Sequence, residues 1–293
     1  MELGGAVVSG IAIGSVYALI ALGFSFIYRT TGSFNFAQGQ IVTFGSLISY
    51  SLYVSAGVPA LAAIVIVAIA AGALGAIVER VAIWPLASRG DDTLTWLIST
   101  LGVAVLITGF AERVWGTIPL GVPNYVGPNV IHLGGQINLA TPYLIGIGSV
   151  LVAAAAIEVS QRFTIWGKAM RATADNRQAV ALAGVNVIRL GVVSFAIGGA
   201  LAGIAGFVLA PITFADSTAG MSFAVLAFAA LAIGGFASHW GAIFGGWLVG
   251  ITESIGGTYA GLQYQDIFVF GVLIVILLIR PEGLTGSRNV RLV

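Results

Sequence analysis

The sequence predicts an all-α integral membrane protein, a bundle of about eight or nine spans with some short, interrupted helices. Only 8% of the 293 residues are charged, against about 25% in a typical soluble domain. Hydrophobic residues make up 58% and the mean hydropathy is +1.04, so a monomeric globule of this composition could not stay dissolved. Several apolar runs reach the roughly 20 residues that a helix needs to cross about 30 Å of hydrocarbon. We expect a single transmembrane domain over residues 1–293.

Nine apolar runs, separated by turn or charge signals, are candidate passes through the membrane. They lie at about 3–28, 41–54, 59–83, 93–115, 139–158, 188–211, 223–237, 241–255 and 264–280. The count falls to eight if one of the shorter runs is re-entrant. The first run is too long for the hydrophobic core of a cleavable signal, and no basic residue precedes it, so we expect it to remain as the first helix.

The positions of lysine and arginine predict the orientation, because cytoplasmic loops contain these residues in excess. Basic residues occur in 80–92, 160–190 and 280–293, whereas 114–138, 212–222 and 256–263 contain none. We therefore expect a multi-pass protein of the bacterial inner membrane with its N-terminus outside and its C-terminus in the cytoplasm. Nine crossings, an odd number, place the two termini on opposite sides of the membrane, as this orientation requires.

Glycine is abundant, with 41 residues, and much of it has the small-xxx-small spacing that lets helices approach closely in lipid. The pairs are Gly10 with Gly14, Gly199 with Gly203, Gly241 with Gly245, and Gly246 with Gly250. We expect these positions to lie at helix contacts.

The composition argues against catalysis or metal binding on this chain. Without cysteine, disulfides, cysteine-ligated zinc and thiol nucleophiles are excluded. His132 and His239 are far apart and lack metal-ligand spacing, and Gly167-Lys168 is followed by alanine, so no nucleotide-binding phosphate loop is present. A net charge of +1 excludes a basic footprint for nucleic acid. We expect no catalytic residue, cofactor or metal here, and no nucleic-acid partner.

Residues 160–190 form a polar segment within this apolar chain. Inserting the four charges of 170–190 into a bilayer would cost about 10 kcal/mol, so we expect two short helices along the cytoplasmic face. Thr164 is placed to cap the first helix, Asp175 and Gln178 form a capping box for the second, and Gly184 is placed to end it. Such a knob could dock into a groove on another protein. The alternative is an ordinary basic loop that fixes the topology.

Two polar interruptions are candidates for a translocation pathway, because short glycine-interrupted runs in two halves of a chain often mark one. One is TTGSFNFAQGQ at 30–40 and the other is SHWG at 238–241. The amides of Asn35, Gln38 and Gln40 could bind a zwitterion, with Phe36 against an apolar side chain. The alternative is a turn packed between helices, and His239 at a cytoplasmic turn needs no special role.

Acidic residues inside spans are costly and are usually paired or functional. Glu79, beside Arg80 near a span end, is expected to pair with it or to reach the interface. Glu253 has no neighbour of opposite charge in the sequence, so we include it among the pathway candidates. The Pro- and Gly-rich segment 116–138 is expected outside the membrane, with a hairpin around Gly134-Gly135, either as a rim for a binding protein or as a lid on the bundle.

The order of several motifs resembles LivH-type permease subunits of branched-chain amino acid ABC transporters, the hydrophobic amino acid uptake family. The matching segments are 17–47 (YALIALGFSF…), 167–190 (GKAMRATADN…), 195–211, 244–257 and 278–286 (LIRPEGLTG). The resemblance implies a second, LivM-like permease chain, two cytoplasmic ATPases that hydrolyse ATP, and an extracytoplasmic solute-binding protein. It also implies that 167–185 couples to the ATPases, with Lys168, Arg171, Asp175, Arg177, Gln178 and Gly184 as candidate contacts.

The chain departs from the family at Gln38 and Gln40, where relatives often have histidine and an acidic residue. Neutral amides do not titrate, so a proton relay through this motif is in doubt. Similar permeases move urea, short amides, or small carboxylic and aromatic acids, and these solutes remain alternatives. Two rivals are a channel or secondary carrier that works alone, and an intramembrane enzyme, for which the chain lacks candidate residues.

Overall fold

The computed structural model describes residues 3–87, 93–127, 130–132, 138–236 and 238–285. Within these residues, a helix forms at each of the nine apolar runs. The helices are α1 (Leu3–Thr31), α2 (Gln38–Tyr50), α3 (Ala60–Val78), α5 (Thr93–Trp115), α6 (Thr141–Phe163), α9 (Val187–Thr213), α10 (Gly220–Gly234), α11 (His239–Tyr259) and α12 (Gln265–Ile279). Six candidate spans are long and apolar enough to cross a membrane, so the predicted polytopic helical bundle is confirmed.

Short elements extend or connect these helices. The π-helical turns η1 (Ser51–Ser55) and η2 (Glu79–Ile83) continue α2 and α3, and α4 (Trp84–Ala87) follows η2. Two helices, α7 (Ile165–Asp175) and α8 (Arg177–Leu182), lie between α6 and α9, and the 3-10 turn η3 (Leu262–Tyr264) precedes α12. The strands β1 (Val130–His132) and β2 (Asn138–Ala140) pair antiparallel.

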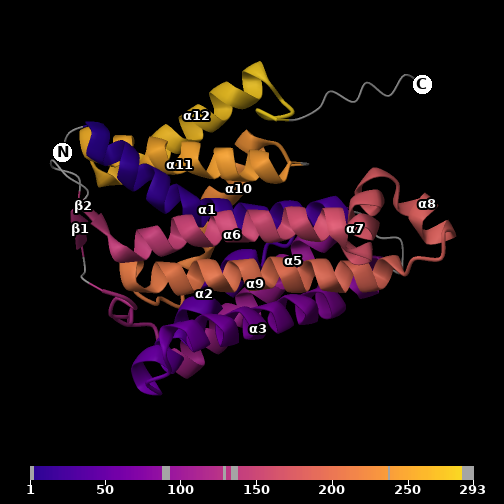
Figure 1. Ribbon diagram of the computed structural model, residues 1–293, viewed down its shortest axis with the longest axis horizontal. Helices are drawn as coiled ribbons and strands as arrows, with labels where there is room; N and C mark the ends of the chain where they lie inside the picture. Colours follow the sequence, from indigo (N-terminus) through magenta and orange to yellow (C-terminus); the bar gives the residue numbers. More distant parts are fainter. Residues whose placement is uncertain (1–2, 88–92, 128–129, 133–137, 237, 286–293) are drawn as a thin grey trace.

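The bundle has two distinct ends (Figure 1). We call the end with β1 and β2 the hairpin end, and the end with α7 and α8 the polar end. The register His132↔Asn138 agrees with the expected hairpin, whose turn at Gly134-Gly135 lies outside the described residues. An isolated bridge between Leu120 and Ala215 joins the hairpin-end loop to the segment that follows α9.

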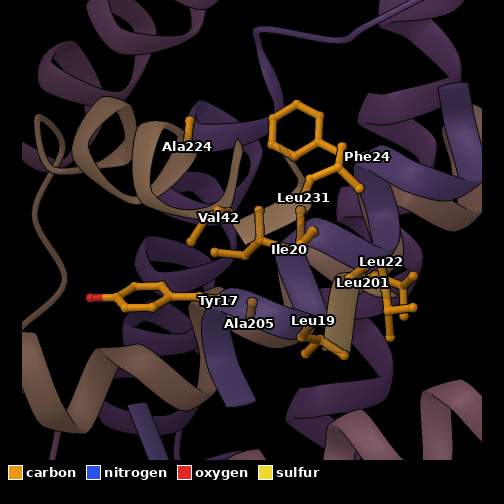
Figure 2. Packing of buried hydrophobic residues seen from close by; sticks show 14 of the residues in the cluster. Tyr17, Leu19, Ile20, Leu22, Phe24, Val42, Leu201, Ala205, Ala224 and Leu231 are labelled. Atoms are coloured by element: carbon orange, nitrogen blue, oxygen red, sulfur yellow. The ribbon is translucent and has the colours of Figure 1, made fainter. Parts of the chain in front are cut away.

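Helix α1 is the centre of the bundle. In its most apolar window 72% of the residues are buried, against 6% for the span Leu262–Ile279. Figure 2 shows Tyr17, Leu19, Ile20, Leu22 and Phe24 of α1 among side chains from α2, α9 and α10. A helix that is apolar on all sides is suited to such a position, whereas α12 leaves most of its surface for lipid or another chain.

The glycine pairs lie at helix contacts, as the spacing predicts. Gly10 and Gly14 of α1 meet Gly246 and Gly250 of α11 backbone to backbone, in antiparallel order. Gly199 and Gly203 of α9 face α3 at Ala71, and Gly241 and Gly245 of α11 face α10 at Gly234 and Ala230. Side chains at these positions would separate the helices, and the apolar lipid would not drive them back together.

Replacing Gly250 by alanine tests this packing. A Cβ at Gly250 would overlap the carbonyl oxygen of Gly10 and the backbone of Gly14, and overpacking of this kind costs about 1–3 kcal/mol. We expect Gly250→Ala to lower the melting temperature of the purified protein in detergent. Gly109→Ala on α5 is the control, because its Cβ would meet no atom within 4 Å. Equal stability of the two variants would contradict the packing argument.

Candidate functional site

The first polar interruption folds back into the bundle. Helix α1 ends at Thr31, Gly32 has a left-handed backbone (φ +73), and the chain remains non-helical until α2 begins at Gln38. The side-chain nitrogen of Gln38 donates to the carbonyl oxygen of Gly198 in α9 at 2.8 Å, and Gln38 also lies against Gly23 of α1. Helix α2 therefore starts well inside the bundle, between α1 and α9.

Asn35 and Gln38 hold this re-entrant turn together. The Asn35 side-chain oxygen accepts from the backbone N–H of Ala37 at 3.1 Å, and its amide nitrogen donates to the side-chain oxygen of Gln38 at 3.3 Å. Both residues are fully buried. The backbone N–H of Phe36 donates to Thr100 Oγ1 of α5 at 3.3 Å. Two of the predicted pathway amides are thus engaged with partners of the chain itself.

An aromatic cluster packs beside the turn. The ring of Phe34 stacks on Tyr28 with 4.5 Å between centroids, and it meets Phe228 and Phe236 edge-on, both at 5.4 Å. Phe36 joins the cluster through Phe228 at 5.7 Å. The cluster ties the first interruption to α10 and to the second interruption, between α10 and α11.

A further break follows α9, within the segment 212–222 that the sequence predicts as a loop outside the membrane and not as part of a pathway. Phe214 has a left-handed backbone (φ 65), and the chain is non-helical until α10 begins at Gly220. The start of α10 crosses the start of α2, because a Cβ on either Gly39 or Gly220 would overlap the backbone oxygen of the other. Two half-length helices therefore begin next to each other inside the bundle.

Polar side-chain atoms without partners lie at this crossing. Gln40 is 6% exposed and Thr43 is 3% exposed, and neither Gln40 Oε1 nor Thr43 Oγ1 has a hydrogen-bond partner among the described residues. A Cβ at Gly220 would lie 2.8 Å from the first atom and 2.5 Å from the second. Buried polar atoms are nearly always bonded, so Gln40 differs from Asn35 and Gln38 in having capacity left for a ligand.

A cavity of about 1270 Å³ opens beside this crossing, between α1, α10, α11 and α12. Its wall includes Tyr17 of α1, Tyr143 of α6, and Met221 and Ser222 from the first turn of α10. Glu253 of α11 also lines the cavity, and its Oε2 atom has no hydrogen-bond partner among the described residues. The tyrosines and Ser222 gave no signal in the sequence, since each is a single polar residue in an apolar run.

Glu79 and Arg80 interact electrostatically, but no close ion pair joins them in the part of the chain that the structure describes. The guanidinium of Arg80 lies over the Trp84 ring, 5.3 Å from its centroid, whereas Glu79 is only 5% exposed. It lines a small cavity of about 130 Å³ with Trp96 and Arg177. Residues 79 and 80 lie in a helical turn, where consecutive side chains point in different directions, so adjacency in sequence did not bring the two charges together.

His239 is partly buried and connects three helices. Its Nδ1 lies 3.3 Å from Ser25 Oγ of α1, and its Nε2 lies 2.8 Å from the amide nitrogen of Gln161 in α6. The ring also stacks on Phe26 at 5.8 Å. These contacts place His239 at the junction of three helices, which a sequence pattern does not reveal, and they do not contradict the expectation that it needs no special role.

The polar segment forms two capped helices, as predicted, with one correction. Thr164 Oγ1 accepts from the N–H of Gly167 at 2.9 Å and caps α7. Asp175 does not cap α8, because it is the last residue of α7. Instead Asn176 has an extended backbone and its side-chain oxygen accepts from the N–H of Ala179 at 3.0 Å. Asparagine caps as well as aspartate, so the break lies one residue later. Gly184 follows with φ +84.

The predicted contact residues lie on the surface of the polar end. Lys168, Arg171, Asp175, Arg177, Gln178 and Gly184 are all exposed. Apolar side chains lie among them: Ile165 is 85% exposed and Leu182 is 90% exposed. Arg177 also donates from its guanidinium to the carbonyl oxygen of Thr31 at 2.9 Å, which ties α8 to the last residue of α1 and so to the first interruption.

Taken together, the fold and the site are those of a membrane permease: a polytopic helical bundle with broken helices that begin inside it, beside an open cavity. The chain belongs to the family described as the branched-chain amino acid transport system / permease component, whose family model matches residues 6–277.

Relatives of known name are similar over nearly the whole chain. The chain is 31% identical to the high-affinity branched-chain amino acid transport system permease protein BraD of Pseudomonas aeruginosa, covering 97% of this chain and 95% of that protein. It is 30% identical to LivH of Escherichia coli K12, with 96% and 95% covered. A solved structure, PsaBC from Streptococcus pneumoniae in complex with Fab, is similar at a TM-score of 0.49 and 14% identity, covering 96% of this chain and 93% of that chain.

Hydrogen exchange of the backbone amides of α8 tests the helix cap at Asn176. Replacing Asn176 by alanine removes the acceptor for the N–H of Ala179, which costs about 1 kcal/mol. We expect hydrogen exchange of the α8 backbone to become roughly fivefold faster, as measured by mass spectrometry. Asp175→Ala is the matched control and should leave exchange unchanged. A faster exchange in Asp175→Ala alone would restore the original assignment.

Proposed function

We propose that this chain is the permease subunit of an ATP-binding cassette importer that moves branched-chain or related apolar amino acids across the bacterial inner membrane. The family match and the names of the relatives support the transport system and its solute class. ATP hydrolysis is assigned to two partner ATPases. The observation that carries the proposal is the α7–α8 pair, a polar and exposed knob at one end of an apolar bundle.

The α7–α8 pair is the surface on which the ATPases dock. Ile165 and Leu182 expose large apolar side chains beside Lys168, Arg171, Arg177 and Gln178. This mixture suits a short helix that enters a groove with its apolar side and fixes its orientation with charges at the rim. A lipid-facing role does not suit it, because four charges of this segment would be costly in hydrocarbon.

Two rigid connections lead from the docking surface into the bundle. At the start of α7, a Cβ on Gly167 would overlap the backbone of Ser160, so α7 is tightly packed on the end of α6. At the start of α8, Arg177 binds the last carbonyl of α1. Closure of the ATPases would push on α6 and α1 together, and α1 contacts both half-helices. Alternating access then follows as a rocking of the bundle around the crossing of α2 and α10.

The charge distribution supports an orientation with the polar end in the cytoplasm. Basic residues of the described chain gather there: Arg29 in the last turn of α1, Arg162 in the last turn of α6, Lys168 and Arg171 in α7, Arg177 in α8 and Arg189 in the first turn of α9. Arg113 lies at the opposite end of α5, at the hairpin end. With cytoplasmic excess of basic residues, α1 begins outside and the C-terminus lies inside. The hairpin end, with segment 116–138, then meets the extracytoplasmic binding protein.

The remaining partner is a second, LivM-like permease chain. The span Leu262–Ile279 is only 6% buried over its apolar window, and the cavity between α1, α10, α11 and α12 lies beside it. Within the pathway set, we assign Gln40 and Glu253 to solute contact because each has an unpartnered oxygen. Asn35, Phe36 and Gln38 shape the re-entrant turn, and the neutral amides make no proton relay.

Reconstitution tests this function. Proteoliposomes containing the chain, its partner permease, both ATPases and the binding protein should accumulate radiolabelled leucine only when ATP is supplied. Uptake of urea, a short amide or a carboxylic acid in place of leucine would assign a different solute. ATP-independent transport by this chain alone would identify a stand-alone channel or carrier instead.

A pair of surface substitutions tests both docking and orientation. We expect Leu182→Asp to weaken copurification with the ATPases by about tenfold or more, since an exposed apolar anchor would become a charge in the groove. Ile118→Asp, at an apolar position of the hairpin end that is 78% exposed against 90% for Leu182, is the matched control and should retain the ATPases. Loss of the ATPases in Ile118→Asp with retention in Leu182→Asp would reverse the orientation.

A further inference from the structure

The large cavity has an unbalanced charge. Glu253 and Asp266 both line it, and its described lining includes no lysine or arginine. Glu253 Oε2 is inaccessible to solvent and has no hydrogen-bond partner among the described residues. The Glu253 carboxylate is partly buried and bonds to the Tyr17 hydroxyl, but an oxygen left unbonded is unfavourable, so this position favours a ligand that brings a positive charge.

The start of α10 favours a negatively charged group in the same cavity. Met221 and Ser222, in the first turn of α10, line the wall, and the N-cap residue Ala219 makes no side-chain capping hydrogen bond. The N-terminus of a helix has unbonded N–H groups and a partial positive charge. Such an end attracts carboxylates.

A second, independent observation marks this helix start. Gln40 Oε1 and Thr43 Oγ1 come within reach of Gly220, the first residue of α10. Both side chains are more than nine-tenths buried, and both atoms lack hydrogen-bond partners among the described residues. The Thr43 hydroxyl can donate to a carboxylate. The Thr43 hydroxyl on α2 is therefore an unbonded donor beside the helix N-terminus that already favours an anion, whereas Gln40 Oε1 can only accept a hydrogen bond.

We infer that this cavity binds the transported solute as an α-amino acid zwitterion, with the ammonium at Glu253 and the carboxylate at the start of α10 near Ser222. The aliphatic side chain lies against Ile13, Leu226 and Phe270, which complete the wall. The inference rests on the proposed function and assigns its solute site. The volume of about 1270 Å³ exceeds the roughly 300–1,000 Å³ of ordinary ligand pockets, as expected of a site open toward the hairpin end.

Recognition of both charges predicts which leucine analogues the cavity rejects. Leucinamide keeps the ammonium and lacks the carboxylate, whereas 4-methylpentanoate keeps the carboxylate and lacks the ammonium. Each leaves one end of the site without its partner, and a charge-assisted hydrogen bond contributes roughly tenfold or more in affinity. We therefore expect each analogue to bind at least about tenfold more weakly than leucine.

The absence of cysteine from the chain permits a direct binding assay in the assembled transporter. Ser254→Cys places a thiol in the cavity wall, and leucine should slow its reaction with a small thiol reagent. Thr117→Cys, exposed at the same end but outside the cavity wall, should react at the same rate with or without leucine. Leucinamide and 4-methylpentanoate should protect Ser254→Cys only at concentrations about tenfold higher or more.

Adding Glu253→Gln to Ser254→Cys should raise the half-protecting leucine concentration by about tenfold, and in uptake it should raise the half-saturating concentration similarly. Glu112→Gln, on α5 outside the cavity wall, is the matched control. If leucine is transported but neither protects Ser254→Cys nor outperforms its analogues, the site is wrong and the proposed function stands. If the complete wild-type transporter does not take up leucine, both are wrong. The analogue comparison needs no change at Glu253, so a folding defect in that variant leaves the test intact.

Discussion

Backbone groups inside a bilayer find no water, and this constraint governs the rest of the structure. Two segments, 32–37 and 214–219, leave helical conformation, and the helices that follow them begin inside the bundle. Such breaks are tolerated at membrane depth only where protein encloses them or water reaches them. Helices α5, α9 and α10 contact the first break and the start of α2, and α1, the most deeply buried span, lies beside them at Gly23. The glycine contacts of α1 with α11 bring the backbones close enough to maintain that enclosure.

The two breaks differ in how their polar groups are satisfied. At segment 32–37, the amides of Asn35 and Gln38 bond to neighbouring groups of the chain and leave little hydrogen-bonding capacity for a ligand. At segment 214–219, α10 begins without a side-chain cap and next to the unbonded oxygens of Gln40 and Thr43. A fully bonded turn is suited to hold a shape. An incompletely bonded helix start is suited to receive one more polar group, and it adjoins the cavity lined by Glu253.

Helix α1 also connects the two functions assigned to opposite ends of the molecule. Its last carbonyl accepts from Arg177 of α8, and Tyr17, nearer its other end, lines the large cavity. Movement of the polar end is thereby transmitted by one continuous helix, with α11 packed against it through glycine. Such rigid elements can carry coupling over long distances when they adopt more than one arrangement.

Composition and periodic signals determined the parts of this protein that depend on local physics. Low charge and long apolar runs fixed a helical membrane bundle, glycine spacing located the tight contacts, and Thr164 and Gly184 bounded the polar helices. The sequence predicts the cap of α8 at Asp175, one residue before the observed cap at Asn176, because aspartate and asparagine satisfy a helix start equally well.

Only the tertiary structure decided which residues from distant parts of the chain meet. It placed Gly39 against Gly220, left Gln40 Oε1 without a partner among the described residues while engaging Gln38, and joined His239 to α1 and α6. It also turned Arg80 toward Trp84. The physical reason is that these outcomes depend on how whole helices cross, and a helix crossing is set by many small contacts that no single stretch of sequence contains.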